Sequence, residues 1–361
     1  MRRSRRLDEI ETRQVEWLWP NYIPLGELTI IDGEPGVGKS TACVAIASLV
    51  TQRHPMPGER KAHTKRTAVL YMGFEDDEQK TIAPRFHAAQ AAMDRVFFLN
   101  SVPVLDDNGD PLVDKTGEPV DASFRIPRDI DHLEHELDMI RTETGTEAAI
   151  IVIDGLFDVL DGKKDSHKQQ DMRDSLRPLA RLAQRRGIAI LLIRHFSKSP
   201  GNKATSAGGG SIAFTAIARS VLTLGRDENG NAHLAVAKAN LASLPPNQIP
   251  SFGYQILPTE GIEAGHLEWT GDSGITADEI VGGRDKEKPL DKADRIALML
   301  KELFWDQDII LGTELNAALT GFEATTNTKT EGKRRAGLEV HEQAGHATTW
   351  RWKDRAVDDV F

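Results

Sequence analysis

The chain has little that would crosslink it or hold it in a membrane. Its single cysteine, Cys43, has no partner for an intramolecular disulfide and no companion for a cysteine metal cluster. No apolar run approaches the roughly 20 residues that cross a bilayer. The basic start at residues 2–6 leads into polar residues rather than into the apolar core of a signal peptide. We therefore expect a cytoplasmic protein without a membrane partner.

Aromatic residues and net positive charge are also scarce. Aromatic side chains make up 6% of the sequence, and 45 lysines and arginines stand against 55 aspartates and glutamates, a net charge of −10. This balance disfavours indiscriminate coating of nucleic acid but leaves local basic loops able to contact phosphates. The length of 361 residues exceeds one typical core and predicts a large domain with a smaller one.

What the chain does contain is a phosphate-binding motif. Residues 33–41 match the pattern G-x-x-x-x-G-K-[ST], between an expected strand at 28–31 and a helix that begins near Lys39. Glycines let backbone N–H groups turn toward an oxyanion, Lys39 reaches the β- and γ-phosphates, and the Ser40 hydroxyl can bind Mg²⁺. The sequence therefore predicts a site for ATP and Mg²⁺. The expected nucleotide-binding residues are Gly33, Glu34, Pro35, Gly36, Val37, Gly38, Lys39, Ser40 and Thr41.

Two further acidic residues end apolar runs. Asp154 follows the β-branched run 148–153, which is typical of a Walker B strand whose carboxylate helps Ser40 to hold the metal. Its alternative role is to cap a turn. Glu75 follows the strand at 68–72, and we predict that it is the catalytic base that orients the attacking water.

The acidic cluster around Glu75 has a second interpretation, in which Asp76 or Asp77 caps the following helix. Arg85 lies further along that helix. It either stacks on the adenine of the nucleotide or lies in solvent.

The order of the expected elements indicates the fold class. Apolar strands alternate with helices, which predicts an α/β fold with a parallel sheet covered on both faces. The expected strands are 28–31, 68–72, 96–99, 149–153, 189–193 and 220–224, with possible antiparallel edge strands at 232–237 and 254–257.

These elements define the expected domains. We assign an ATPase domain to residues 1–260, with an acidic surface excursion at 106–131, and a glycine-rich, acidic linker to 261–288. Residues 289–361 begin with helical periodicity and end with alternation typical of a hairpin, so we predict a small winged-helix-like domain there.

The phosphate loop, the strand that ends in Glu75, the Walker B strand and the strand that ends in His195 follow one another in an order that resembles the RecA-like ATPase core. More narrowly, this order resembles the RepA-type hexameric replicative helicases of plasmids and related phage ATPases, over roughly residues 15–257. The resemblance implies a homo-hexamer or other ring, with ATP between subunits and a basic finger supplied by the neighbour. Arg219 and Lys238 are the candidates for this finger, and His195 is the candidate sensor of the γ-phosphate. Arg219 could equally form a structural salt bridge, and His195 a hydrogen bond to a turn.

Two polar loops follow the strands that end in Asp154 and His195. The first contains Lys163 and Lys164, and the second contains Lys198 and Lys203. A ring would repeat these lysines around its bore, where they suit the backbone of single-stranded DNA. The alternative is two solvated loops.

Together these features predict ATP hydrolysis coupled to single-stranded DNA binding or translocation, as in a replicative helicase-like motor. The alternatives are a RecA-like recombinase or mediator, and a nucleotide-switched regulatory ATPase.

Overall fold

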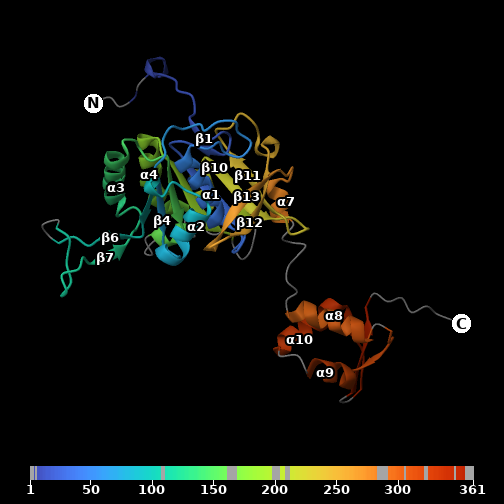
Figure 1. Ribbon diagram of the computed structural model, residues 1–361. Helices are drawn as coiled ribbons and strands as arrows, with labels where there is room; N and C mark the ends of the chain where they lie inside the picture. The colour runs from blue at the N-terminus through green and yellow to red at the C-terminus, as the bar shows by residue number, and fades with distance from the viewer. Residues whose placement is uncertain are drawn as a thin grey trace. The chain divides into compact units, whose positions relative to one another are not determined.

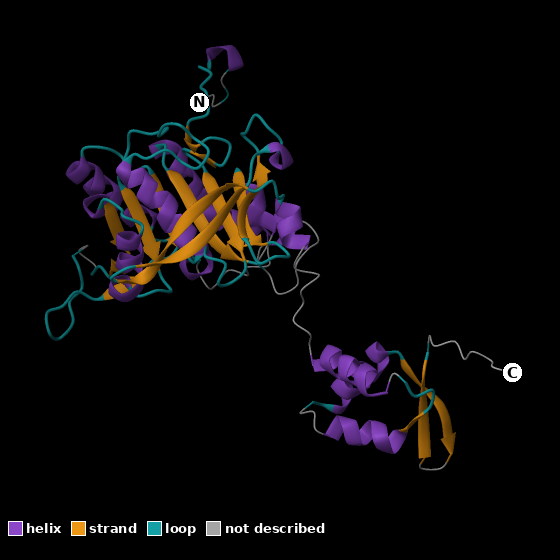
Figure 2. Cartoon of the chain, turned by 45° about the vertical axis from the view of Figure 1, so that its right-hand side comes forward, coloured by secondary structure: helices purple, strands orange, loops and turns teal. Residues whose placement is uncertain are grey.

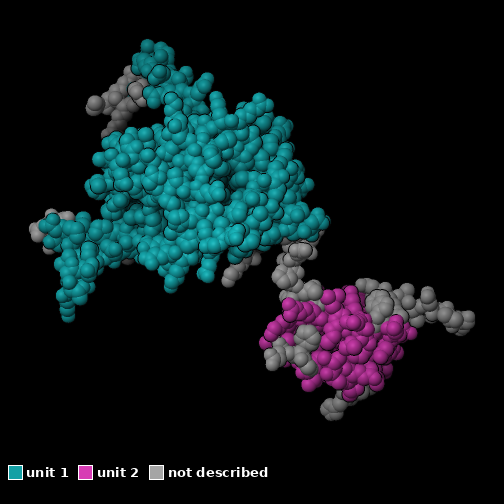
Figure 3. Space-filling view, viewed as in Figure 1, with its two compact units in different colours: residues 1–283 teal, residues 284–361 magenta. Residues whose placement is uncertain are grey.

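The computed structural model describes Ser4 and residues 6–106, 110–160, 169–196, 204–207, 212–282, 292–304, 306–320, 324–344 and 347–353. Figure 1 labels the elements, and Figure 2 distinguishes helices from strands. The chain divides into two compact units, residues 1–283 and 284–361 (Figure 3).

The first unit is built on a mixed sheet. Nine described strands follow the order β13-β12-β11-β10-β3-β9-β8-β4-β5, and the six from β10 to β5 are mutually parallel. The parallel strands are β3 (Leu28–Gly33), β4 (Val69–Gly73), β5 (Val96–Leu99), β8 (Ile150–Asp154), β9 (Ala189–His195) and β10 (Ser220–Arg226). The antiparallel strands are β11 (Ala232–Ala239), β12 (Phe252–Thr259) and β13 (Ile262–Asp272). The α/β fold, the parallel strands and the two antiparallel strands expected from the sequence are confirmed.

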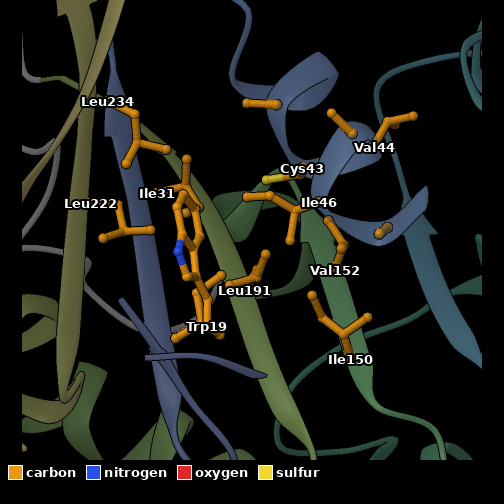
Figure 4. Close-up of a cluster of buried hydrophobic side chains, with 14 of the residues drawn as sticks. Trp19, Ile31, Cys43, Val44, Ile46, Ile150, Val152, Leu191, Leu222 and Leu234 are labelled. Atoms are coloured by element: carbon orange, nitrogen blue, oxygen red, sulfur yellow. The ribbon is translucent and has the colours of Figure 1, made fainter. Parts of the chain in front are cut away.

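Alternate residues of each central strand pack on opposite faces of this sheet. In β8, Ile150 and Val152 join the core beneath α1 (Lys39–Gln52), whereas Ile151 and Ile153 join the core beneath α3 (Ile130–Thr144) and α4 (Gln169–Arg186). Figure 4 shows Cys43, Val44 and Ile46 of α1 with the side chains of neighbouring strands in the first of these cores. Burial on both faces explains why these strands read as continuous apolar runs.

The linker expected at 261–288 is corrected by the structure. Residues 262–272 form β13, which pairs along β12, and α7 (Ala277–Gly282) packs against β10 and β11. The first unit therefore extends past the expected boundary at residue 260. The sequence signal is weak because Leu267 is the only buried residue of β13, and the other residues of this strand are partly or fully exposed.

Short elements complete the first unit. The strand β6 (Ser101–Pro103), just before the excursion, pairs with β7 (Asp121–Ser123) within it, and Figures 1 and 2 show this ribbon extending from the body of the unit. The other short elements are η1 (Leu7–Glu9), β1 (Trp17–Trp19), β2 (Ile23–Pro24), the π-helix η2 (Glu78–Ile82), α2 (Ala83–Ala88), η3 (Met93–Arg95), η4 (Leu156–Val159), α5 (Ala204–Ala207), α6 (Ile212–Ile217) and η5 (Pro246–Gln248).

The second unit has a separate core. Its elements are α8 (Lys292–Phe304), β14 (Ile310–Leu311), α9 (Gly312–Thr320), α10 (Thr326–Ala336), β15 (Leu338–Ala344) and β16 (Ala347–Trp352). The strands form a small antiparallel sheet, β14-β16-β15, and the expected terminal hairpin is confirmed. Ile296, Leu300, Leu315 and Trp352 are buried in its core. Among the described residues of the whole chain, no helix has both the length and the apolar character required to cross a bilayer.

Candidate active site

The phosphate loop connects β3 to α1, as the motif predicts. Gly36 and Gly38 have φ angles of 75° and 95°, in the left-handed region that favours glycine. A Cβ atom on Gly38 would lie 2.5 Å from Cδ1 of Ile256, so a side chain at this position would also collide with β12. The Tyr254 hydroxyl donates a hydrogen bond of 2.7 Å to the Val37 carbonyl oxygen. The loop is therefore held against β12 as well as between β3 and α1.

Lys39 points back into this loop. Its Nζ atom donates to the carbonyl oxygens of Gly33, at 3.1 Å, and of Glu34, at 2.7 Å, and it lies 3.0 Å from Nδ1 of His195. Burial lowers the pKa of Lys39, and the Asp154 carboxylate opposes that change. Burial and the nearby Lys39 charge both lower the pKa of His195. A neutral His195 accepts the hydrogen bond from the Lys39 ammonium.

The sheet register explains why His195 meets the phosphate loop. His195 lies opposite Gly33 in the pairing of β9 with β3, at the carboxyl end of both strands. The structure thus brings the expected sensor into contact with the expected phosphate-binding lysine. The alternative role for His195 was a hydrogen bond to a turn. In the structure its hydrogen-bond contact is with Lys39.

Asp154 ends β8, one strand further from the phosphate loop than β9. Its Oδ2 atom accepts a hydrogen bond of 2.6 Å from the Tyr71 hydroxyl, which fixes the orientation of a carboxylate that is only 7% exposed. The described residues contain no group of three or more His, Cys, Asp or Glu side chains that would hold a metal by itself. Mg²⁺ commonly keeps several waters and takes one or two protein oxygens with nucleotide phosphates, and the Asp154 carboxylate with the Ser40 hydroxyl fits that pattern.

Glu75 follows β4 at the same edge of the sheet. Burial raises the pKa of Glu75, and the neighbouring carboxylates of Asp158 and Asp154 raise it further. Gly155 makes room for this cluster, since a Cβ atom there would lie 2.9 Å from Oε1 of Glu75 and would overlap the Asp158 carboxylate. A carboxyl group with a raised pKa at the sheet edge that carries the phosphate loop is typical of a general base.

In the acidic cluster that follows β4, the residue that caps the next helix is Asp77. Asp77 accepts hydrogen bonds from the backbone N–H groups of Gln79 and Lys80, at 3.0 and 2.7 Å, at the start of η2. Asp76 instead pairs with Arg85 at 2.7 Å. Arg85 is thus held by a carboxylate, and its side chain is 25% exposed rather than freely solvated.

Glu75 lines a cavity of about 820 Å³ that we call the acidic cavity. Its acidic lining residues are Glu75, Asp76, Asp77, Asp121 and Asp158, and Arg125 is the basic one. Gly73, Phe74 and Phe157 complete the wall nearest β4 and η4.

The two candidate finger residues lie near each other but differ in their contacts. Lys238 donates to the carbonyl oxygens of Thr215, at 2.5 Å, and Ala218, at 2.8 Å, and so caps the end of α6 within its own subunit. The Arg219 side chain is 48% exposed, and its Nε atom lies 3.8 Å from the Glu27 carboxylate. This long contact is the salt bridge considered from the sequence. Within the described residues, Arg219 is therefore more exposed and more weakly held than Lys238.

The sequence analysis missed a buried ion pair behind the phosphate loop. The guanidinium of Arg194 binds both carboxylate oxygens of Asp32, at 2.7 and 2.6 Å, and the two side chains are 1% and 0% exposed. They are register partners, one residue before His195 and Gly33. The signal was present in the sequence, because each charge interrupts the end of an apolar strand. The expected DNA-binding residues Lys163, Lys164, Lys198 and Lys203 lie outside the described residues.

Comparison with known proteins agrees with this geometry. A family model described as an AAA domain matches residues 2–201, more than half of the chain. The chain belongs to this AAA-domain family. It is a RecA-like P-loop NTPase, and the match covers β3, the phosphate loop, Glu75, Asp154 and His195. Arg219 and Lys238 of this AAA-domain protein lie beyond the matched region. No curated protein matches the chain.

Proposed function

We propose that this AAA-domain protein binds ATP with Mg²⁺ at the phosphate loop and hydrolyses it with Glu75 as the general base. The observation that carries the proposal is the placement of the Lys39–His195 contact and of Glu75 at one edge of the sheet. Backbone N–H groups of the loop bind the phosphates, and Lys39 neutralises charge on the β- and γ-phosphates. Ser40 and Asp154 would hold Mg²⁺, which supplies further neutralisation of that charge.

Glu75 acts on the attacking water. Its raised pKa increases its affinity for a proton, and its ionised form accepts the proton of the water. When the nucleotide binds, Lys39 Nζ moves from the carbonyl oxygens of the loop to the phosphates, and its contact with His195 changes as well. His195 then reports the γ-phosphate to the loop that follows β9.

We further propose that hydrolysis is coupled to single-stranded DNA in a ring of identical subunits, as in a helicase-like motor. The support is the resemblance to RepA-type helicases and the position of four lysines, which follow the strands that end in Asp154 and His195. Arg219 would enter the neighbouring active site and neutralise charge on the transferred phosphoryl group. The element order of the second unit, helix-strand-helix-helix-strand-strand, supports a winged-helix-like role in this assembly.

The test is ATP turnover of the full chain with and without single-stranded DNA. We expect turnover to rise severalfold with DNA and to be lost in the Lys39→Ala and Glu75→Gln variants. The matched control is Glu143→Gln, which makes the same change on the exposed surface of α3 and should retain both turnover and stimulation. Turnover that ignores DNA would reject the motor and favour a nucleotide-switched regulatory ATPase.

A further inference from the structure

The second unit, residues 284–361 (Figure 3), lies outside the region that the AAA-domain family model matches. Its elements follow the order α8-β14-α9-α10-β15-β16, and β14 pairs with β16 beside the β15–β16 hairpin. Two successive helices, α9 and α10, thus lead into a hairpin, in the order of a helix-turn-helix followed by a β-ribbon. In a helix-turn-helix the second helix enters the major groove of DNA. In this chain, α10 is the helix in the corresponding position.

α10 packs against α8 through its small residues. Gly332 and Ala336 are the buried residues of α10. A Cβ atom on Gly332 would overlap the Ile296 side chain of α8, so glycine permits the close approach of the two helices. Helical periodicity turns the opposite face of α10 away from α8. That outer face carries four exposed polar residues, Thr326, Asn327, Thr330 and Arg334.

α10 is basic, although the chain as a whole is acidic. It contains four basic residues and one acidic residue, a formal charge of +3, whereas the whole chain has a net charge of −10. The basic residues are Lys329, Lys333, Arg334 and Arg335. Lys333 lies against the hairpin, where its Nζ atom is 4.6 Å from the centre of the Trp350 ring. Positive charge concentrated on one helix complements the phosphates of nucleic acid.

The acidic residue of α10, Glu331, holds two of the arginines. Arg334 donates two hydrogen bonds to the Glu331 carboxylate, at 2.8 and 2.6 Å, and Arg335 donates one, at 2.9 Å. The Arg334 side chain is nevertheless 74% exposed. Exposed ion pairs contribute little to stability, so another anion can replace Glu331 as the partner of both guanidinium groups.

From these observations we propose that the second unit binds double-stranded DNA, with α10 in the major groove. An α-helix with its side chains is about 10–12 Å across, which fits a groove about 12 Å wide. Asparagine and arginine form paired hydrogen bonds with adenine and guanine, so Asn327 and Arg334 on the outer face suit the edges of bases. Lys329 and Arg335, on either side of that face, suit the phosphates.

Duplex DNA fits this surface better than a single strand does. Single-stranded nucleic acid is commonly held by aromatic side chains that stack on its bases. Within the described part of the second unit, Phe304 and Trp352 are buried, and Trp350 is half-buried beneath Lys333. Binding of duplex DNA goes beyond the proposed function, because it uses a different unit and a different form of DNA and needs no ATP.

The test is binding of the full chain, without ATP, to a fluorescent duplex of about 20 base pairs, or two helical turns, followed by anisotropy. Arg334→Ala removes a positive charge and a partner for guanine, and should raise the Kd at least about tenfold. Glu331→Gln removes the negative charge and releases both arginines, and should lower the Kd about threefold. Tighter binding does not arise from a misfolded unit, so the second variant tests the proposal even if the first one unfolds.

Two variants of α8 are the matched controls. Lys301→Ala and Glu302→Gln remove the same charges at exposed positions of that helix. Each should leave the Kd for the duplex within about twofold of the wild-type value, because solvent and salt screen charges that do not touch the DNA.

Three results would overturn the inference: a wild-type chain that does not bind the duplex at low salt, an Arg334→Ala variant that binds it as the wild type does, or a Glu331→Gln variant that binds it no more tightly. Arg334→Ala that weakens binding of a single strand as much as binding of the duplex would also overturn it.

ATP turnover with single-stranded DNA is measured on the same preparations. If wild-type turnover ignores DNA while duplex binding follows the charges of α10, the proposed motor fails and the duplex site stands. If turnover responds to DNA and duplex binding does not follow those charges, only the duplex site fails.

Discussion

Replacement of Arg194 by methionine should strongly destabilise the first unit. The guanidinium binds both oxygens of Asp32, at 2.7 and 2.6 Å, and also lies 5.6 Å from the centre of the Phe214 ring. Because the two charged side chains are 1% and 0% exposed, water cannot replace the lost partner. Removing one member of a buried ion pair costs about 3–5 kcal/mol. At about 1.4 kcal/mol per tenfold change, the opening equilibrium should increase by about two to three and a half orders of magnitude.

The double variant Asp32→Val/Arg194→Met separates the net contribution of the ion pair to stability from the cost of leaving one buried charge unpaired. Replacing both charges by apolar side chains leaves no buried ion, so the double variant should be within about 1 kcal/mol of the wild type or more stable than it. The double variant should therefore lose far less stability than the sum of the losses of the two single variants.

Hydrogen exchange of peptides from β8 and β9 is the appropriate assay. The full chain has two compact units, so its overall unfolding need not be two-state. Fully buried central strands exchange through the global opening of their own unit, and thus report on the first unit alone. Exchange in Arg194→Met that is less than about tenfold faster than in the wild type, or a double variant as unstable as the single one, would refute the reasoning.

Three further predictions concern the site. Asp158→Asn removes a negative charge and a hydrogen bond that raise the pKa of Glu75, so the acid limb of the pH–kcat profile should move to lower pH; an unmoved limb would separate Glu75 from that limb. Tyr254→Phe removes the donor to the Val37 carbonyl oxygen and should raise the Kd for ATP about fivefold in calorimetry, for a hydrogen bond worth about 1 kcal/mol, whereas unchanged affinity would show that the loop does not depend on β12. His195→Ala should lower kcat more than ATP affinity, and His195→Asn, which keeps an acceptor for the lysine ammonium, should restore part of the rate; equal loss in both variants would argue against the contact.

The sequence was most informative where local chemistry determines structure. The phosphate loop requires glycine at positions such as Gly36 and Gly38, which have positive φ angles, and the buried strands require apolar residues on both faces. These requirements can be recognised directly from the residue types. The phosphate loop and the positions of the parallel strands were therefore predictable without coordinates.

Features that depend on pairing between distant segments were harder to predict. Only Leu267 of β13 is buried, and this strand is held by its hydrogen bonds to β12, so its residues carry little apolar periodicity. The contact between Lys39 and His195 joins residues 156 positions apart, and it follows from the register of β3 with β9. Arg194 is visible in the sequence as a charge at the end of an apolar run, but its partner Asp32 follows only from the register of the two strands.

The roles of neighbouring residues were also hard to predict, as the Asp76–Arg85 pair shows. The acidic cluster suggested a helix cap and a base, and the structure assigns the cap to Asp77. Which of three consecutive carboxylates caps η2, and which one pairs with Arg85, depends on the turn of the backbone after β4. The residue types alone do not predict the conformation of that turn.

The central claim is that Glu75 performs the chemistry at a site that Lys39 and His195 help to form. The most direct test is a single-turnover measurement of ATP hydrolysis by Glu75→Gln, with nucleotide affinity measured on the same preparation. Loss of a general base typically lowers the rate by about 10²–10⁴-fold, and we expect that loss with ATP affinity within about threefold of the wild type, because glutamine keeps the shape of the side chain but cannot accept the proton of the water as glutamate does. Hydrolysis within a few-fold of the wild-type rate would contradict the assignment of Glu75 as the base.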